Sequence, residues 1–143
     1  MSLETIITRL KTIEENITGI EKAFDAAPES VASGDLPVVL NISDSGEFSI
    51  EAGGYGRTDH TIRILLLVTP RTDLAADEAK VRPFVKRFRD AFAAAVKLDG
   101  LSTVAHAELT SYRYGAITYG ESEYAGIEFT LEVTEKEAIS VEA

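Results

Sequence analysis

The stretch Ile127-Glu128-Phe129-Thr130-Leu131-Glu132-Val133-Thr134 alternates apolar and polar side chains without a break. Because successive side chains of a strand point to opposite faces of a sheet, this period of two predicts a half-buried strand. We extend the strand over residues 124–134 and pair it with a second strand over 103–119, with the turn at Gly120-Glu121-Ser122. The C-terminal third is therefore predicted to be a β-hairpin.

Further strands are expected before this hairpin. Residues 60–69 contain the apolar run Ile64-Leu65-Leu66-Leu67-Val68, which predicts a strand in the middle of the sheet with cover on both faces. Residues 37–42 and 47–52 are interpreted as a hairpin that turns at Asp44-Ser45-Gly46, and Gly53-Gly54-Tyr55-Gly56 then interrupts regular structure. A short strand is a candidate within 20–27.

Two segments have helical spacing. Apolar residues recur at that spacing from Leu3 to Ile17, with Ser2 as the expected N-cap and an end near Asn16 to Gly19. The second helix places Phe84, Phe88 and Phe92 on one stripe. It begins near Arg82 or is kinked at Pro83, because a proline inside a helix removes a backbone hydrogen bond.

The expected architecture is a single α+β domain over residues 1–143, with a mainly antiparallel sheet, one long helix packed on it and an N-terminal helix. The predicted order is α-β-β-β-α-β-β. Residues 136–143 have no pattern and are expected to be a loose tail. Residues 53–57 and 71–80, rich in glycine or in small and charged residues, are expected to be mobile loops.

The charge is segmented along the chain. The whole chain has a formal net charge of −10, yet residues 57–97 hold nine of the fourteen Lys and Arg residues and only five acids. An acidic chain with a sequence pI of about 4.6 is not expected to bind DNA tightly, although DNA could pass through an acidic channel. The start lacks a signal-peptide pattern and no apolar run is long enough to cross a bilayer, so a soluble product without a membrane partner is expected.

A search for chemistry finds no catalytic, metal-binding or cofactor-binding set. The chain has no cysteine and only two histidines, His60 and His106, which we interpret as structural. The glycine-rich segment 53–56 lacks the Gly-Lys-Ser/Thr of a phosphate loop. One enzymatic alternative stays open, a small enzyme that uses scattered carboxylates such as Glu108 and Glu128.

The interaction surfaces are inferred from charge. The basic side chains of the second helix form either a solvated helix face or a subunit interface. In the second case we expect head-to-tail contacts between Lys86, Arg87 and Arg89 of one copy and Glu121, Glu123 and Glu128 of the next. The tyrosines 112, 114, 119 and 124 are explained equally well by cross-strand packing or by an interface.

Four stretches, taken in order, resemble the phage tail terminator family. They are the first helix followed by Gly19-Ile20-Glu21-Lys22-Ala23-Phe24, then Asp35-Leu36-Pro37-Val38-Val39-Leu40, then residues 57–70 leading to Arg82-Pro83-Phe84, and last the hairpin from Tyr119 to Leu131. Together they span nearly the whole chain, and the resemblance rests on their order and spacing.

The resemblance implies a homo-oligomeric ring, typically a hexamer, in the tail and neck of a virion made in the bacterial cytoplasm. Such a ring binds the tail tube protein, stops tube growth and presents a surface to the head-tail connector protein, while DNA passes through it. The family has no catalytic residues. We expect Tyr55 and Arg57 to contact the tube or connector, since an aromatic ring and a guanidinium contribute most to interfaces. Another head-tail connector or tail-tube component is the alternative.

Overall fold

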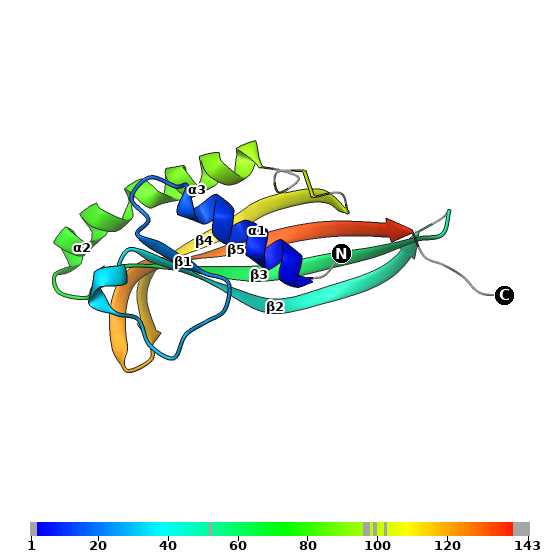
Figure 1. Ribbon diagram of the computed structural model, residues 1–143. Helices are drawn as coiled ribbons and strands as arrows, with labels where there is room; N and C mark the ends of the chain where they lie inside the picture. The colour runs from blue at the N-terminus through cyan, green and yellow to red at the C-terminus, as the bar shows by residue number, and fades with distance from the viewer. Residues whose placement is uncertain (1–2, 52, 96–97, 99, 102, 139–143) are drawn as a thin grey trace.

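The computed structural model describes residues 3–51, 53–95, 98, 100–101 and 103–138, and it confirms the predicted single α+β domain (Figure 1). Its elements in chain order are α1 (Leu3–Glu15), β1 (Lys22–Phe24), the short 3-10 helix η1 (Ser33–Asp35), β2 (Val38–Glu51), β3 (Tyr55–Pro70), α2 (Leu74–Val81), α3 (Pro83–Ala94), β4 (Val104–Tyr119) and β5 (Ser122–Ala138).

The five strands form one sheet in the order β1-β2-β3-β5-β4. The short β1 runs parallel to β2, and the three remaining neighbour pairs are antiparallel. Strand β3 lies at the centre, as its continuous apolar run predicts. Pairing of β3 with β5 continues from Pro70 opposite Tyr124 to Tyr55 opposite Ala138.

Helices α1 and α3 cover the same face of the sheet, which we call the helix face (Figure 1). The predicted phenylalanine stripe points into this layer, and Phe88 stacks on Phe129 of β5 with 4.5 Å between ring centroids. From β3, the even-numbered residues Ile62, Ile64 and Leu66 enter the same core. The largest apolar cluster of the described chain therefore lies between the two helices and the sheet.

A smaller apolar cluster covers part of the opposite face. Leu65 and Leu67 of β3 pack there with Val38 and Leu40 of β2 and with Tyr124 of β5. The chain between β1 and β2 supplies the cover, through partly buried residues that include Val31 and Leu36. This second layer is the reason that β3 is apolar on both faces over 64–68.

The predicted hairpin over 37–52 is wrong, because β2 is one continuous strand. Asp44 lies at a register irregularity between Ser43 and Ser45, where β2 bulges against β3. The turn comes later, at Gly53 and Gly54, which have φ of 93° and 80°. Such positive φ values favour glycine, whereas one bulge residue in a long strand has the same sequence signature as a turn.

The predicted loop over 71–80 is also wrong, since Leu74–Val81 forms α2. Asp77 is buried and accepts hydrogen bonds from the backbone N–H and the hydroxyl of Thr72, at 2.9 and 3.0 Å. The helical stretch breaks at Arg82, and Pro83 begins α3, where its missing N–H has no helical partner to lose. The junction between α2 and α3 thus lies where the sequence predicts a kink or a helix start, and Arg82 keeps helical backbone angles there.

The predicted tail begins too early. Strand β5 continues to Ala138, and Lys136 reaches Glu51 of β2 with an N–O distance of 3.1 Å. The rest of the expected tail, residues 139–143, and the expected Ser2 cap lie outside the described residues. Residues 55–57, expected in a mobile loop, belong to β3.

Candidate functional site

Beyond the smaller apolar cluster, the side of the sheet opposite the helices is charged. The side chains of this part are exposed or half-buried, and no described helix packs on it. We call this surface the polar face, and by the strand registers its members are Ser45, Glu47, Ser49 and Glu51 of β2, Arg57, Asp59, Thr61 and Arg63 of β3, His106, Glu108, Ser111 and Arg113 of β4, and Glu128, Thr130, Glu132, Thr134 and Lys136 of β5.

One charge network on the polar face surrounds Arg57. Its guanidinium lies 3.1 Å from Asp59 and 3.3 Å from Glu51, and Glu51 also contacts Lys136. The hydrogen bond from Lys136 is the main reason that the pKa of Glu51 is lowered. Partial burial acts to raise the pKa of Asp59, but hydrogen bonds from Thr134 and Arg57 outweigh it and lower the pKa.

A second network surrounds Glu128, one of the predicted interface acids. Arg63 approaches it to 3.0 Å and Arg113 to 3.8 Å, and Arg63 also lies 3.9 Å from Asp44. Glu128 thus has two arginine partners in its own chain. Arg63, Arg113 and Glu128 line a hollow in the polar face, where β4 and β5 curve towards their turn.

Acidic side chains outnumber basic ones on the polar face. It holds six carboxylates and four Lys or Arg side chains, and each of the four bases has an acidic partner within 4 Å. Glu47 and Glu132 form no ion pair among the described residues. A phosphate that approached this surface would therefore meet bases that are already paired and acids that repel it.

The structure does not bring the predicted interface residues together within one chain. Glu121 and Glu123 lie at the β4–β5 turn, and Glu123 pairs with Arg71 at 2.9 Å. Lys86 and Arg89 are exposed on α3, where Lys86 pairs with Asp90 at 2.6 Å. The sequence reading missed the partners of Glu123 and Glu128, because they depend on how distant segments meet in the sheet, which the sequence does not state. It also missed the Lys86–Asp90 pair, although the spacing of four residues within one helix was visible in the sequence.

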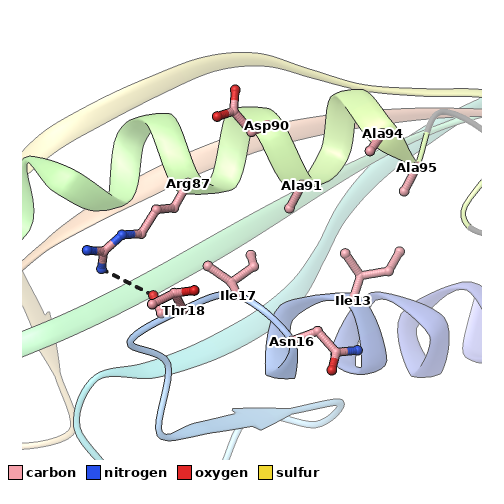
Figure 2. A pocket seen from close by; sticks show the side chains of 9 residues that line it. All are labelled: Ile13, Asn16, Ile17, Thr18, Arg87, Asp90, Ala91, Ala94 and Ala95. Carbon is pink, nitrogen blue, oxygen red and sulfur yellow. Dashed lines mark hydrogen bonds between the residues drawn. The ribbon is translucent and has the colours of Figure 1, made fainter.

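Arg87 has a structural role inside the chain. It lies over the Phe84 ring and donates a hydrogen bond of 3.2 Å to the carbonyl oxygen of Thr18, just after α1 (Figure 2). This contact spans one end of an open groove between α1 and α3, lined also by Ile13, Ile17 and Ala91. Alanine and isoleucine side chains supply the apolar part of the groove lining. Nothing in the structure identifies an occupant.

Tyr55 and Arg57 lie at the opposite end of the sheet from the β4–β5 turn. Tyr55 directly follows the β2–β3 turn and is 50% exposed, so its side chain is accessible from solvent. Arg57 is held by Glu51 and Asp59, so its charge is already balanced. The expected contact by these two side chains stays a prediction.

Two exposed apolar side chains were missed by sequence reasoning. Phe48 and Ile50 of β2 are 87% and 81% exposed, and the register places them on the helix face. The outer end of β2 extends past α1 (Figure 1). The alternation of apolar residues over 48–52 predicts a buried face and cannot reveal that none of the described elements covers it. Their partners on β3, Thr58 and Gly56, were the available signal, since neither is a core residue.

The tyrosines divide between packing and exposure. Tyr124 is buried, and the Tyr119 hydroxyl donates a hydrogen bond to the carbonyl oxygen of Pro28. Tyr114 is partly buried against the helix-face core, whereas Tyr112 is 55% exposed on the edge strand β4. Packing therefore explains three of the four tyrosines and leaves Tyr112 available.

Glu14 of α1 is a buried carboxyl group. It is fully buried in the interior beside Asn41 of β2, whose amide donates hydrogen bonds to Glu14 at 2.6 Å and to the carbonyl oxygen of Phe24 at 3.0 Å. Burial raises the pKa of Glu14 well above its ordinary value. The pair fits an internal tie between α1 and the sheet.

The enzymatic alternative finds little support in the geometry. Glu108 lies opposite Glu132, and Glu128 lies opposite Arg113, so the two proposed carboxylates do not converge. Within the described ranges no three His, Cys, Asp or Glu side chains gather as metal ligands. His60 is largely buried and contacts Glu135 at 3.2 Å, which Thr103 also binds.

Comparison with models of known protein families gives no match, and comparison with curated proteins gives none either. Among the described helices, none has both the length and the apolar character that crossing a bilayer requires.

Proposed function

We propose that this chain is a structural subunit of a phage tail, of the tail terminator kind. Copies form a closed ring, with a hexamer as the working number, that caps the tail tube, stops its polymerisation and joins it to the head connector. In this proposal the protein works in the neck of the virion after synthesis in the host cytoplasm. It has no catalytic role and needs no cofactor.

The observation that carries the proposal is the polar face. A broad, uncovered sheet surface with paired bases and two unpaired acids is suited to line a channel through which DNA passes without adhering. The order and spacing of the motifs in the sequence supply the second support. The exposed Tyr55 at one end of the sheet provides a contact point for a tube or connector ring.

The first test is the mass of the purified protein by light scattering over a concentration series, with electron-microscope images of the same samples. We expect particles with a central hole and a mass that is a whole multiple of 15.5 kDa. Monomers at every concentration would reject the ring. Tubes of indefinite length would favour the alternative, a tail-tube component.

The second test addresses the lining of the channel. The double variant Glu47→Lys with Glu132→Lys reverses the two unpaired acids of the polar face, and we expect it to bind duplex DNA with a steep salt dependence. The matched control, Glu4→Lys with Glu21→Lys, makes the same change of charge at exposed positions outside the polar face. Equal DNA binding by both double variants would show that the polar face does not line the channel.

A further inference from the structure

The sheet has two open edges in the described structure. Strand β1 pairs only with Val38–Leu40, so the remainder of β2, from Asn41 to Glu51, has no strand on its outer side. Strand β4 ends the sheet at the other edge and pairs only with β5. The unpaired backbone N–H and C=O groups of such edges are templates for pairing with another strand.

We infer that successive copies join edge to edge, with the outer half of β2 of one copy paired antiparallel to β4 of the next. This inference rests on the proposed ring and names its interface. The pairs β2/β3, β3/β5 and β5/β4 are all antiparallel, so β2 and β4 run in opposite directions. Two copies placed side by side with the same faces aligned therefore continue the antiparallel pattern.

The apolar side chains on the two edges are complementary. Phe48 and Ile50 project from β2 on the helix face. On the same face β4 borders a hollow lined by residues 109–112 together with Val85, Arg89 and Phe129. An edge strand with two large exposed apolar residues needs a cover, and this hollow beside the opposite edge supplies one.

The stagger needed for closure brings these features together. Within one sheet Phe48 is level with Val104, through Thr58 and Glu135. Closing a sheet with strands tilted by about 35–45° staggers four strands by about 13–19 Å, or about four to six residues. Val104 is the first residue of β4, so a shift of Phe48 towards residues before Val104 would leave it without a partner strand. A shift of the same size towards the C-terminal end of β4 brings Phe48 next to Leu109.

The charges on the two edges are also complementary. Strand β2 contains three acids, Asp44, Glu47 and Glu51, and no base. Strand β4 itself carries one acid, Glu108, and one base, Arg113, which is 86% exposed on the polar face, and the basic helix α3 packs beside β4. The basic side of this interface, α3 with β4, thus includes the helix that the sequence predicts. The acidic side is β2 in place of the predicted Glu121, Glu123 and Glu128. A head-to-tail contact joins two different surfaces of the same chain, one from each copy. This chain carries both edges, so the occupant that fits them is a second copy.

The first experiment measures assembly by light scattering for the unchanged protein, Phe48→Glu and the matched control Ser49→Glu. Both variants add one charge to the same edge strand at exposed neighbouring positions, on the helix face and on the polar face respectively. We expect Phe48→Glu to weaken assembly at least tenfold and Ser49→Glu to change it by less than threefold. Circular dichroism should show the same fold for all three, and equal assembly of both variants would overturn the inference.

The second experiment uses cross-linking, because the chain has no cysteine of its own. Phe48→Cys is mixed with Leu109→Cys or Tyr112→Cys under mild oxidation, and a covalent dimer should form in these mixtures. It should form neither in any variant alone nor with Ser111→Cys, which faces the polar side. An assembly of the expected mass without these cross-links would leave the ring in place and reject the edge pairing. A protein that stays monomeric would reject both.

Discussion

Strands β2 and β3 each have two halves with opposite environments. In the inner half, Val38–Leu40 and Ile64–Val68 are buried between the helices on one face and the segment before β2 on the other. In the outer half, which we call the arm (residues 43–51 and 55–61), no described side chain is buried. The comparison teaches that one continuous pair of strands can be stabilised by layers at one end and have no buried side chain at the other.

The largest expected effect is on the free energy of unfolding, when a glycine of the covered half and a glycine of the arm are each replaced by alanine. In Gly126→Ala the new Cβ would lie 2.0 Å from the carbonyl oxygen of Leu66, inside the covered sheet. We expect a loss of about 4 kcal/mol or more in the free energy of unfolding, measured with urea. In the arm, Gly46→Ala meets its nearest atom, the carbonyl oxygen of Asp59, at 3.4 Å and should be tolerated. Similar losses for both would mean that the arm is packed as tightly as the core.

The next effect compares two phenylalanines. Phe88→Ala removes a fully buried ring stacked on Phe129 and should cost about 3–5 kcal/mol. Phe48→Ala removes a ring that is almost fully exposed and should change the stability of the monomer by less than about 0.5 kcal/mol. Urea unfolding at low protein concentration measures both. A large loss for Phe48→Ala in the monomer would show that the arm folds back on its own chain.

A smaller effect concerns the buried Glu14. Because its folded-state pKa is raised, the folded protein holds a proton that the unfolded chain releases above about pH 4.5. Stability is therefore greatest below that pH and falls as the pH rises towards the folded pKa, by up to about 1.4 kcal/mol per unit. Glu14→Gln should remove this part of the pH dependence. An unchanged slope in Glu14→Gln would show that Glu14 is not the group responsible.

The smallest expected effect concerns the pKa of Glu51 in the arm. Lys136→Met removes the main hydrogen bond to Glu51, so the pKa of Glu51 should rise towards its ordinary value. Carboxyl titration by NMR measures this shift directly. Because a lowered pKa stabilises the fold only above the unfolded value, any effect on stability should disappear as the sample is acidified. A pKa of Glu51 that stays low in the variant would assign the shift to Arg57 instead.

Local patterns predicted the parts of the fold that depend on neighbouring residues. The phenylalanine stripe of α3, the alternation over 127–134 and the apolar run over 64–68 all gave elements that the structure confirms. The hairpin over 37–52 and the loop over 71–80 failed for different reasons. The bulge in β2 depends on its pairing with β3, which the sequence does not state. The short helix α2 begins at a local contact from Thr72 to Asp77 that composition does not reveal.

The sequence by itself determined the fold class, the central position of β3, the helix that packs through its phenylalanines and the acidic balance of the chain. These follow from hydrophobic periodicity and from charge, which are local or additive properties. Only the tertiary structure decided which charges are paired, which face of the sheet is uncovered and which apolar side chains are exposed. Strand register and layer coverage set those features, because they depend on residues far apart in the chain that meet only after folding.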